Sequence, residues 1–238
     1  MPDIFFSSEN LDTYLKELAK EFRKINGKTM PAEVILVGGA AILANYGFRD
    51  KTYDVDAIIH ATSAMKEAAN RVADKFSLPN GWLNSDFKNT KSYSHKLELY
   101  SKHYKTFSNI VEFRIISGEY LMAMKLMSGR TYKHDLSDVA EIYYEHIKIN
   151  TPISYNDLMS AITNLYGEGA EIPETSSKFI KLLYTTPVSN IEKLIMQQKE
   201  IEENSKNSLI QFEEKYETTL NDSNVTDILS AIEKKKKQ

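Results

Sequence analysis

The sequence predicts an α+β fold: a mixed β-sheet flanked by helices, followed by an all-helical C-terminal half. Short branched apolar runs alternate with helical patterns in the first half, and only helical patterns follow Pro152. The length of 238 residues and a hydrophobic content of 42% are sufficient for a substantial core. We therefore expect two domains, residues 1–150 and residues 151–238.

The expected elements of the first half follow from periodicity and from turn residues. Apolar side chains recur at helical spacing in residues 9–26, and Gly27 ends that pattern. The run at 110–116 alternates and is rich in branched residues, which indicates a strand of the central sheet. The further expected strands are 34–37, 54–59 and short pieces at 96–100 and 105–107; the further expected helices are 40–46, 62–76, 119–128 and a helix from Lys133 or Asp135 to about 146.

The second half contains only helical patterns. A long, highly charged helix is expected at 189–218, between shorter helices at 155–166 and 178–183 and a last one at 225–234. This helical half could shape a substrate cleft, form a dimer, or cover the sheet.

The most informative segment runs from Val34 to Ile59. An apolar strand ends in Gly38 and Gly39, and a second strand then opens with Asp54 and Asp56. Alternate strand residues share a face, so the two carboxylates are expected side by side. Like charges this close favour an intervening cation such as Mg²⁺. A glycine turn at a helix N-terminus favours a phosphate, and together these features predict a metal-assisted nucleotide site.

The order and spacing of these motifs resemble the DNA polymerase β-type nucleotidyltransferase superfamily. The segment between Val34 and Tyr144 carries the resemblance: Gly-Gly-Ala, an Arg-x-x-Thr-x-Asp-x-Asp run and a later helix with Lys-Leu and Arg. Within the superfamily, the AbiEii-like group is most similar, and it includes toxins of type IV toxin–antitoxin and phage-defence systems. The resemblance implies that the domain expected at 1–150 is a catalytic domain with a nucleotidyltransferase-type sheet; the helical domain expected at 151–238 lies outside the matching segment.

The resemblance also implies roles for individual residues. Asp54 and Asp56 would be catalytic and hold Mg²⁺ or Mn²⁺. A third carboxylate usually completes such a site, and Glu112 is the main candidate, with Glu98 as the alternative and an exposed strand glutamate as the simpler explanation for each. The expected nucleotide-binding residues are Gly38, Gly39, Ala40, Arg49, Thr52 and Arg130. Ala40 stands where many relatives carry a phosphate-binding serine, so its backbone amide would have to serve.

A second group of charged residues lies near residue 130. Lys125 interrupts an apolar helix, and burial of an unpaired ammonium group is costly, so it is expected either to pair with phosphate or to extend to the surface. By the same resemblance, Lys125 and Asp135 are expected catalytic residues. Asp135 would orient Lys125 or Arg130, or act as a base, whereas Asp138 would cap or pair.

Composition limits the functional classes. A net charge of −3 argues against a globally basic nucleic-acid-binding protein, although the lysines and aromatic residues of segment 86–107 could form a local RNA surface or simply an exposed loop. The chain has no cysteine, no run of membrane-spanning length and no signal-peptide pattern in its first twelve residues, so we expect a cytoplasmic protein without a membrane partner.

The leading functional hypothesis is a Mg²⁺-dependent enzyme that transfers NMP from an NTP to an acceptor and releases pyrophosphate. By family resemblance the acceptor is RNA, above all tRNA, or a protein, and the biological outcome is growth arrest or phage defence with a cognate antitoxin. The alternatives are a regulatory or binding module on the same fold and a transferase that modifies a small molecule such as an antibiotic.

Overall fold

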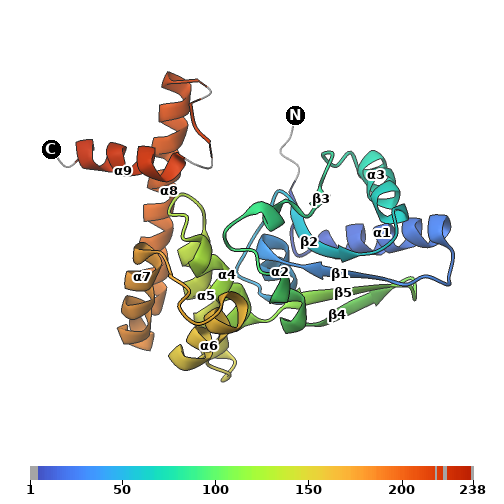
Figure 1. Cartoon of the computed structure of the whole chain (residues 1–238), viewed down its shortest axis with the longest axis horizontal. Coiled ribbons are helices and arrows are strands. Elements are labelled where there is room, and N and C mark those ends of the chain that lie inside the picture. The colour runs from blue at the N-terminus through green and yellow to red at the C-terminus, as the bar shows by residue number, and fades with distance from the viewer. Residues whose placement is uncertain (1–4, 218, 222–223, 237–238) are drawn as a thin grey trace. The chain divides into compact units, whose positions relative to one another are not determined.

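The computed structural model describes residues 5–217, 219–221 and 224–236 (Figure 1). It confirms the α+β fold class, with a five-stranded mixed sheet in strand order β3-β2-β1-β5-β4. The strands are β1 (Ala32–Leu36), β2 (Val55–His60), β3 (Leu83–Asn84), β4 (Ser101–Phe107) and β5 (Val111–Ile116).

The central strand β1 sets the register of the sheet. It pairs antiparallel with β2 and parallel with β5, so that Leu36 lies between Ala57 and Ile115, and Glu33 lies between His60 and Glu112. The C-terminal end of β1 therefore lies beside the N-terminal end of β2. This edge of the sheet carries the glycine turn and the first residues of β2.

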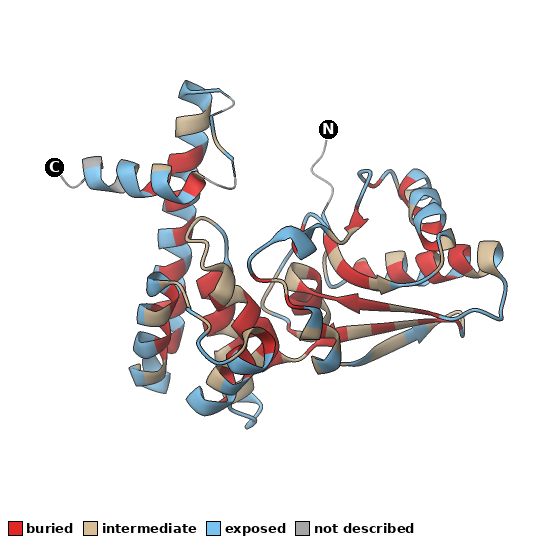
Figure 2. Ribbon diagram, viewed as in Figure 1, coloured by how far each residue is buried: buried red, intermediate tan, exposed pale blue. Residues whose placement is uncertain are grey.

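One face of the sheet packs against α1 (Leu11–Asn26) and α3 (Ala64–Phe76), which lie side by side in Figure 1. Tyr14 of α1 meets Phe76 of α3 edge to face, with ring centroids 5.1 Å apart. Trp82 is buried and stacks on Phe6 at 5.7 Å. Figure 2 shows the resulting buried stripes along these elements. Burial of these large rings contributes much of the hydrophobic stabilisation of this part of the fold.

The chain forms two compact units. The first comprises residues 1–124 and 156–170, and the second comprises residues 125–155 and 171–238. Helices of the first unit, besides α1 and α3, are α2 (Gly38–Asn45), the 3₁₀ turns η1 (Asp86–Asn89) and η2 (His95–Tyr100), and most of α6 (Tyr155–Tyr166). The second unit contains α5 (Asp135–Lys148), α7 (Glu174–Thr185), the 3₁₀ turn η3 (Val188–Asn190), α8 (Ile191–Lys215) and α9 (Val225–Lys236).

The boundary between the compact units falls within α4 (Gly118–Ser128), after Met124. The predicted division into a catalytic domain at 1–150 and a helical domain at 151–238 concerns function and stays a prediction. Within the described ranges, no helix is both long and apolar enough to cross a membrane. The first four residues, on which part of the cytoplasmic expectation depends, lie outside the described residues.

One expected strand is wrong. Residues 96–100 form part of the 3₁₀ turn η2, and β4 begins only at Ser101. Ser94 caps η2 by accepting a hydrogen bond from the Lys96 amide at 3.3 Å, and its hydroxyl donates to the Leu165 carbonyl at 2.7 Å. A buried Leu97 anchors the turn. Side-chain-to-backbone hydrogen bonding of this kind competes with strand pairing. It explains why the residue pattern at 96–100 wrongly predicted a strand.

Candidate functional site

The glycine turn lies directly against Asp56. Gly38 has a φ of +54°, which side chains rarely adopt, and a Cβ added there would lie 3.4 Å from Asp56 Oδ2. The Val37 amide donates to the Asp56 carbonyl at 3.0 Å and fixes the start of β2 beside the turn. The carboxylate of Asp56 therefore faces a backbone segment that has no side chain.

Gly39 contacts two further residues of the predicted set. A Cβ added at Gly39 would lie 2.6 Å from Thr52 Oγ1 and 3.4 Å from Arg49 Cζ. Thr52 is held in place by Phe6, because the two residues exchange backbone hydrogen bonds of 2.7 and 2.9 Å. The structure thus brings Gly38, Gly39, Arg49, Thr52 and Asp56 together, and their roles in nucleotide and metal binding stay predictions.

The start of α2 has the chemistry of an anion site. The first amides of a helix have no partner within the helix. Val37, at the N-cap of α2, has no side-chain oxygen that could accept from them. Ala40 is buried, so only its backbone could contribute to binding. Partial positive charge at a helix N-terminus favours a phosphate, and phosphate binding by these amides stays a prediction.

The two aspartates at the start of β2 are accessible to solvent. Asp54 is exposed, Asp56 is half-buried, and Val55 between them is fully buried. Asp54 lies one residue before β2 begins. This alternation fits two carboxylates on the side opposite Val55, which is the arrangement expected of a strand. Their joint role as metal ligands stays a prediction.

The structure corrects the assignment of Glu112. It shares a face of the sheet with Asp56, but it pairs with Glu33, at the opposite end of β1 from the glycine turn. At a rise of about 3.3 Å per residue, the two carboxylates are roughly 13 Å apart along the strands, with β1 between them. Glu112 contacts His103 Nδ1 at 3.2 Å. The alternative, Glu98, accepts a hydrogen bond at 2.7 Å from His60, the residue that pairs with Glu33.

A pocket of about 460 Å³ also lies at that far end. Its walls include Glu33, His60 and Glu112. Glu33 also forms an ion pair with Arg114 at 3.5 Å. Within the part of the chain that the structure describes, no group of three or more His, Asp or Glu side chains could hold a metal ion.

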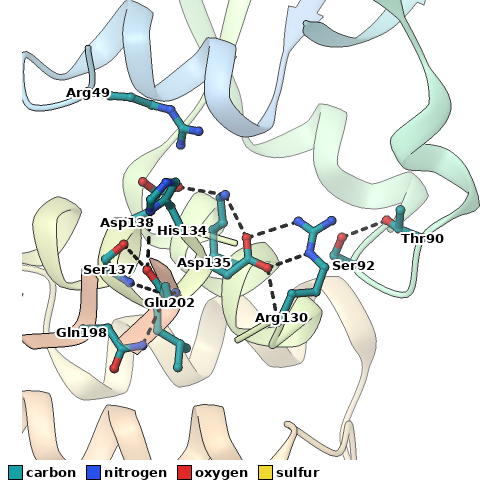
Figure 3. A network of polar contacts seen from close by, with 12 residues as sticks. Arg49, Thr90, Ser92, Arg130, His134, Asp135, Ser137, Asp138, Gln198 and Glu202 are labelled. Atoms are coloured by element: carbon teal, nitrogen blue, oxygen red, sulfur yellow. Dashed lines mark hydrogen bonds and ion pairs between the residues drawn. The ribbon is translucent and has the colours of Figure 1, made fainter. Parts of the chain in front are cut away.

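A second cluster of charged residues lies in the second unit (Figure 3). Asp135 is 0% exposed, and it contacts Lys125 Nζ at 3.0 Å and Arg130 Nε at 2.8 Å. Lys125 also contacts Asp138 at 2.8 Å, and its side chain is only 12% exposed. The alternative of a surface lysine is therefore excluded, and the expected pairing with phosphate stays a prediction. Pairing with two aspartates removes the cost of burying the ammonium group.

The environment of Asp135 determines its protonation. Burial raises the pKa of its carboxyl group, but the charge of Lys125 and the hydrogen bond and charge of Arg130 together outweigh burial, and the pKa lies well below its ordinary value. A general base at neutral pH works best with a pKa near that pH. Of the two predicted roles, the geometry favours orientation of Lys125 and Arg130 over proton abstraction.

Sequence reasoning missed Glu202, which lies on α8 and is 1% exposed. Its Oε1 accepts from the amides of Leu136 and Ser137 at 2.9 and 3.1 Å, and its Oε2 accepts from Ser137 Oγ at 2.5 Å. These are the first-turn amides of α5, whose N-cap residue His134 makes no side-chain cap. A glutamate in a long charged helix gives no sequence signal for such a contact.

A glycine bend beside a partly exposed acid is the arrangement of a candidate phosphate and metal site. Comparison with family models agrees: the family described as "Nucleotidyltransferase of unknown function" (DUF6036) matches residues 13–166, well over half of the chain. The chain belongs to this nucleotidyltransferase family. Comparison with curated proteins and with solved structures found no match.

Proposed function

We propose that this nucleotidyltransferase transfers an NMP group from an NTP to a hydroxyl group of RNA, with Asp54 and Asp56 as the catalytic carboxylates that bind the metal ion. The observation that carries the proposal is the contact between Asp56 and the bare backbone at Gly38, at the N-terminus of α2. A triphosphate bound by the α2 amides would place its phosphates beside these carboxylates. Membership of a nucleotidyltransferase family supports the same reaction class.

The residues present fit a divalent cation that shares its ligands with substrate. Mg²⁺ is usually bound by one or two carboxylates plus substrate phosphates, so Asp54 and Asp56 are sufficient protein ligands for Mg²⁺ or Mn²⁺. A bound cation would neutralise charge that develops on the phosphates. With Glu112 at the far end of the sheet, substrate oxygens would have to complete the coordination shell.

The remaining proposed contacts follow the same chemistry. The amides of Gly38, Gly39 and Ala40 would bind phosphate oxygens. Arg49, whose guanidinium group lies beside Gly39 and donates to the Lys51 carbonyl at 3.2 Å, would contribute positive charge. In the second unit, Lys125 and Arg130 are proposed to contact phosphate, and Asp135 to orient them.

In the proposed reaction, the acceptor hydroxyl oxygen forms a bond to the α-phosphorus of the NTP. The bond from that phosphorus to the oxygen bridging to the β-phosphorus breaks, and pyrophosphate leaves with the electron pair. The hydroxyl proton passes to water. Positioning and charge stabilisation account for most of the catalysis in such a transfer.

Two exposed aromatic rings support a polynucleotide acceptor. Phe5 and Tyr53 are 43% and 54% exposed, and Lys51 Nζ lies 5.6 and 5.4 Å from their ring centroids. The Phe6–Thr52 bridge fixes this group on the side opposite buried Phe6 and directly before Asp54. Exposed rings with a cation between them fit stacked bases and a phosphate backbone.

The resemblance to the AbiEii-like group extends the proposal to biology. The protein would act as a toxin of a toxin–antitoxin or phage-defence system, with tRNA as the leading acceptor and a cognate antitoxin as its partner. The proposed site of action is the cytoplasm.

The direct test is incubation of the protein with each α-labelled NTP, Mg²⁺ and total RNA. Label on RNA that disappears when EDTA replaces Mg²⁺ supports the proposal. Matched arms with total protein and with small-molecule extracts distinguish the other acceptors. Failure to label RNA in the presence of any NTP contradicts an RNA acceptor.

A second candidate is a regulatory or binding module on the same fold. Ala40 in place of serine and the distance of Glu112 from Asp56 favour it. In that case the protein would bind an NTP without transferring label to any acceptor. Label on a small molecule would identify the third candidate, an antibiotic-type transferase.

A further inference from the structure

The loop of residues 129–134 carries Arg130 and leads into the first turn of α5, which carries Asp135. Elements that lie beyond the family-matched residues 13–166 contact this loop at two points and the first turn of α5 at a third. Since α7, α8 and α9 all belong to the second unit with the loop, these contacts occur within one compact unit.

The first contact involves Gly129, which has a φ of +59°. A Cβ added at Gly129 would lie 2.9 Å from Pro173 Cγ and 3.1 Å from Ser176 Oγ, so α7 packs directly on the loop backbone. The second contact involves Tyr132, which packs against the cluster formed by Leu209 of α8 and by Val225 and Leu229 of α9.

The third contact is the cap by Glu202. Its carboxylate accepts hydrogen bonds from two first-turn amides of α5, those of Leu136 and Ser137, and from the Ser137 hydroxyl, and Gln198 Nε2 donates to it at 3.4 Å. A negative group at a helix N-terminus is favourable, and replacing a cap residue by alanine typically costs a measurable part of the stability. Figure 3 shows Glu202 and Gln198 of α8 beside Ser137, which lies on the turn of α5 that presents Asp135.

From these contacts we propose that Glu202 is a positioning residue of the nucleotidyl transfer. It fixes the first turn of α5, and thereby the carboxylate of Asp135 to which Lys125 and Arg130 bind. On this proposal, the function of the C-terminal helices is to hold the charged loop in place. The inference rests on the proposed function for its catalytic part and on the second unit alone for its structural part.

The test uses the full-length chain with Glu202→Gln, Glu202→Ala and a control, Glu203→Gln, at the exposed neighbouring position. Gln keeps an oxygen acceptor and is the milder change. Amide hydrogen exchange at Leu136 and Ser137, taken relative to Ile142 in the interior of α5, should rise about 5- to 30-fold in Glu202→Ala and less in Glu202→Gln. The ratio to Ile142 separates a local change from general destabilisation.

Two further readouts test positioning. The NMR signal of Arg130 Nε–H, which donates to Asp135, should shift in the native state of Glu202→Gln and stay unchanged in Glu203→Gln. RNA labelling by Glu202→Gln should fall about tenfold, as is common when a residue that orients catalytic groups changes. Glu202→Ala should be less active than Glu202→Gln.

Unchanged exchange at Leu136 and Ser137 in Glu202→Gln and Glu202→Ala would overturn the cap. A changed exchange rate with wild-type labelling and an unshifted Arg130 signal would overturn the positioning role. If Glu202→Ala does not fold, Glu202→Gln decides between these results. If the wild-type protein labels no acceptor, the proposed function fails, and the exchange ratio and the Arg130 signal still decide whether Glu202 holds the loop.

Discussion

The two clusters of acidic residues differ in how they meet solvent. In the first unit, Asp54 is exposed and Asp56 is half-buried beside a glycine bend. In the second unit, Asp135 and Glu202 are buried and surrounded by donors from this chain. Accessible carboxylates can exchange water for a cation and a substrate, whereas buried, fully bonded ones fix the positions of their neighbours. The difference separates residues suited to chemistry from residues suited to orientation.

The largest expected effect is that of Asp56→Asn on labelling of RNA. Loss of the proposed metal-binding charge would remove several kcal/mol of transition-state stabilisation, which corresponds to a fall of about 100- to 1,000-fold. The control is Asp74→Asn, an exposed acid on α3, which should keep wild-type activity. An active Asp56→Asn protein would contradict the assignment of the chemistry to the accessible carboxylates of the first unit.

Next is Asp135→Asn, which should act on stability. It removes the buried carboxylate that Lys125 and Arg130 share, and breaking a buried ion pair costs about 3–5 kcal/mol of unfolding free energy. Denaturant unfolding measures the change. Asp227→Asn on the exposed side of α9 should leave the midpoint unchanged, and an equal loss in both variants would contradict the role of the pairing.

The same pair predicts a pH dependence. The pKa of Asp135 is lower in the folded protein than its unfolded value of about 3.9, so its stabilisation is complete above that value. Below the unfolded-state pKa, the stabilisation decreases progressively as pH falls toward the folded-state pKa. Unfolding free energy measured from pH 6 down to pH 2.5 should therefore fall more steeply for wild type than for Asp135→Asn; parallel curves would contradict the lowered pKa.

A smaller effect is expected for Gly39→Ala. The added methyl group would overlap Thr52, and overpacking of this kind typically costs about 1–3 kcal/mol. Adding Thr52→Ala should recover part of the loss, because it removes the nearest atom. Gly47→Ala is the matched control, since a Cβ there meets nothing within 4 Å. Equal unfolding midpoints for the Gly39 and Gly47 variants would show that the bend tolerates a side chain.

The smallest effect is expected for Glu112→Gln. Because Glu112 lies at the far end of the sheet from Asp56, labelling should stay within about twofold of wild type, as for most surface changes. A fall of tenfold or more would restore Glu112 to the metal site and would require a different register for β5.

Local patterns predicted more of this molecule than long-range contacts did. The glycine turn, the start of β2 and the helix at 155–166 follow from periodicity and turn residues over a few positions. Grouping of Gly39 with Arg49 and Thr52 was also predictable, because a short loop joins them. The position of Glu112 in the sheet depends on the register between β1 and β5. The alternation of apolar and polar residues along one strand does not determine that register.

The second cluster shows the same limit. An apolar helix with one lysine and a following pair of aspartates indicated that Lys125 needs a partner, and the structure supplies Asp135 and Asp138. Glu202 lies 67 residues after Asp135 in the sequence, on a helix with many other glutamates. Only the packing of α8 on α5 distinguishes it from them.

The most direct test is a titration with Mg²⁺ and a non-hydrolysable NTP. The backbone amide NMR signals of Gly38 and Gly39 report on binding at the glycine bend. The account predicts that both signals shift on addition of Mg²⁺ and NTP to the wild-type protein, and that they stay in place when Asp56→Asn is titrated in the same way. Nucleotide binding that leaves both signals unmoved in the wild-type protein would contradict a triphosphate site at the glycine bend.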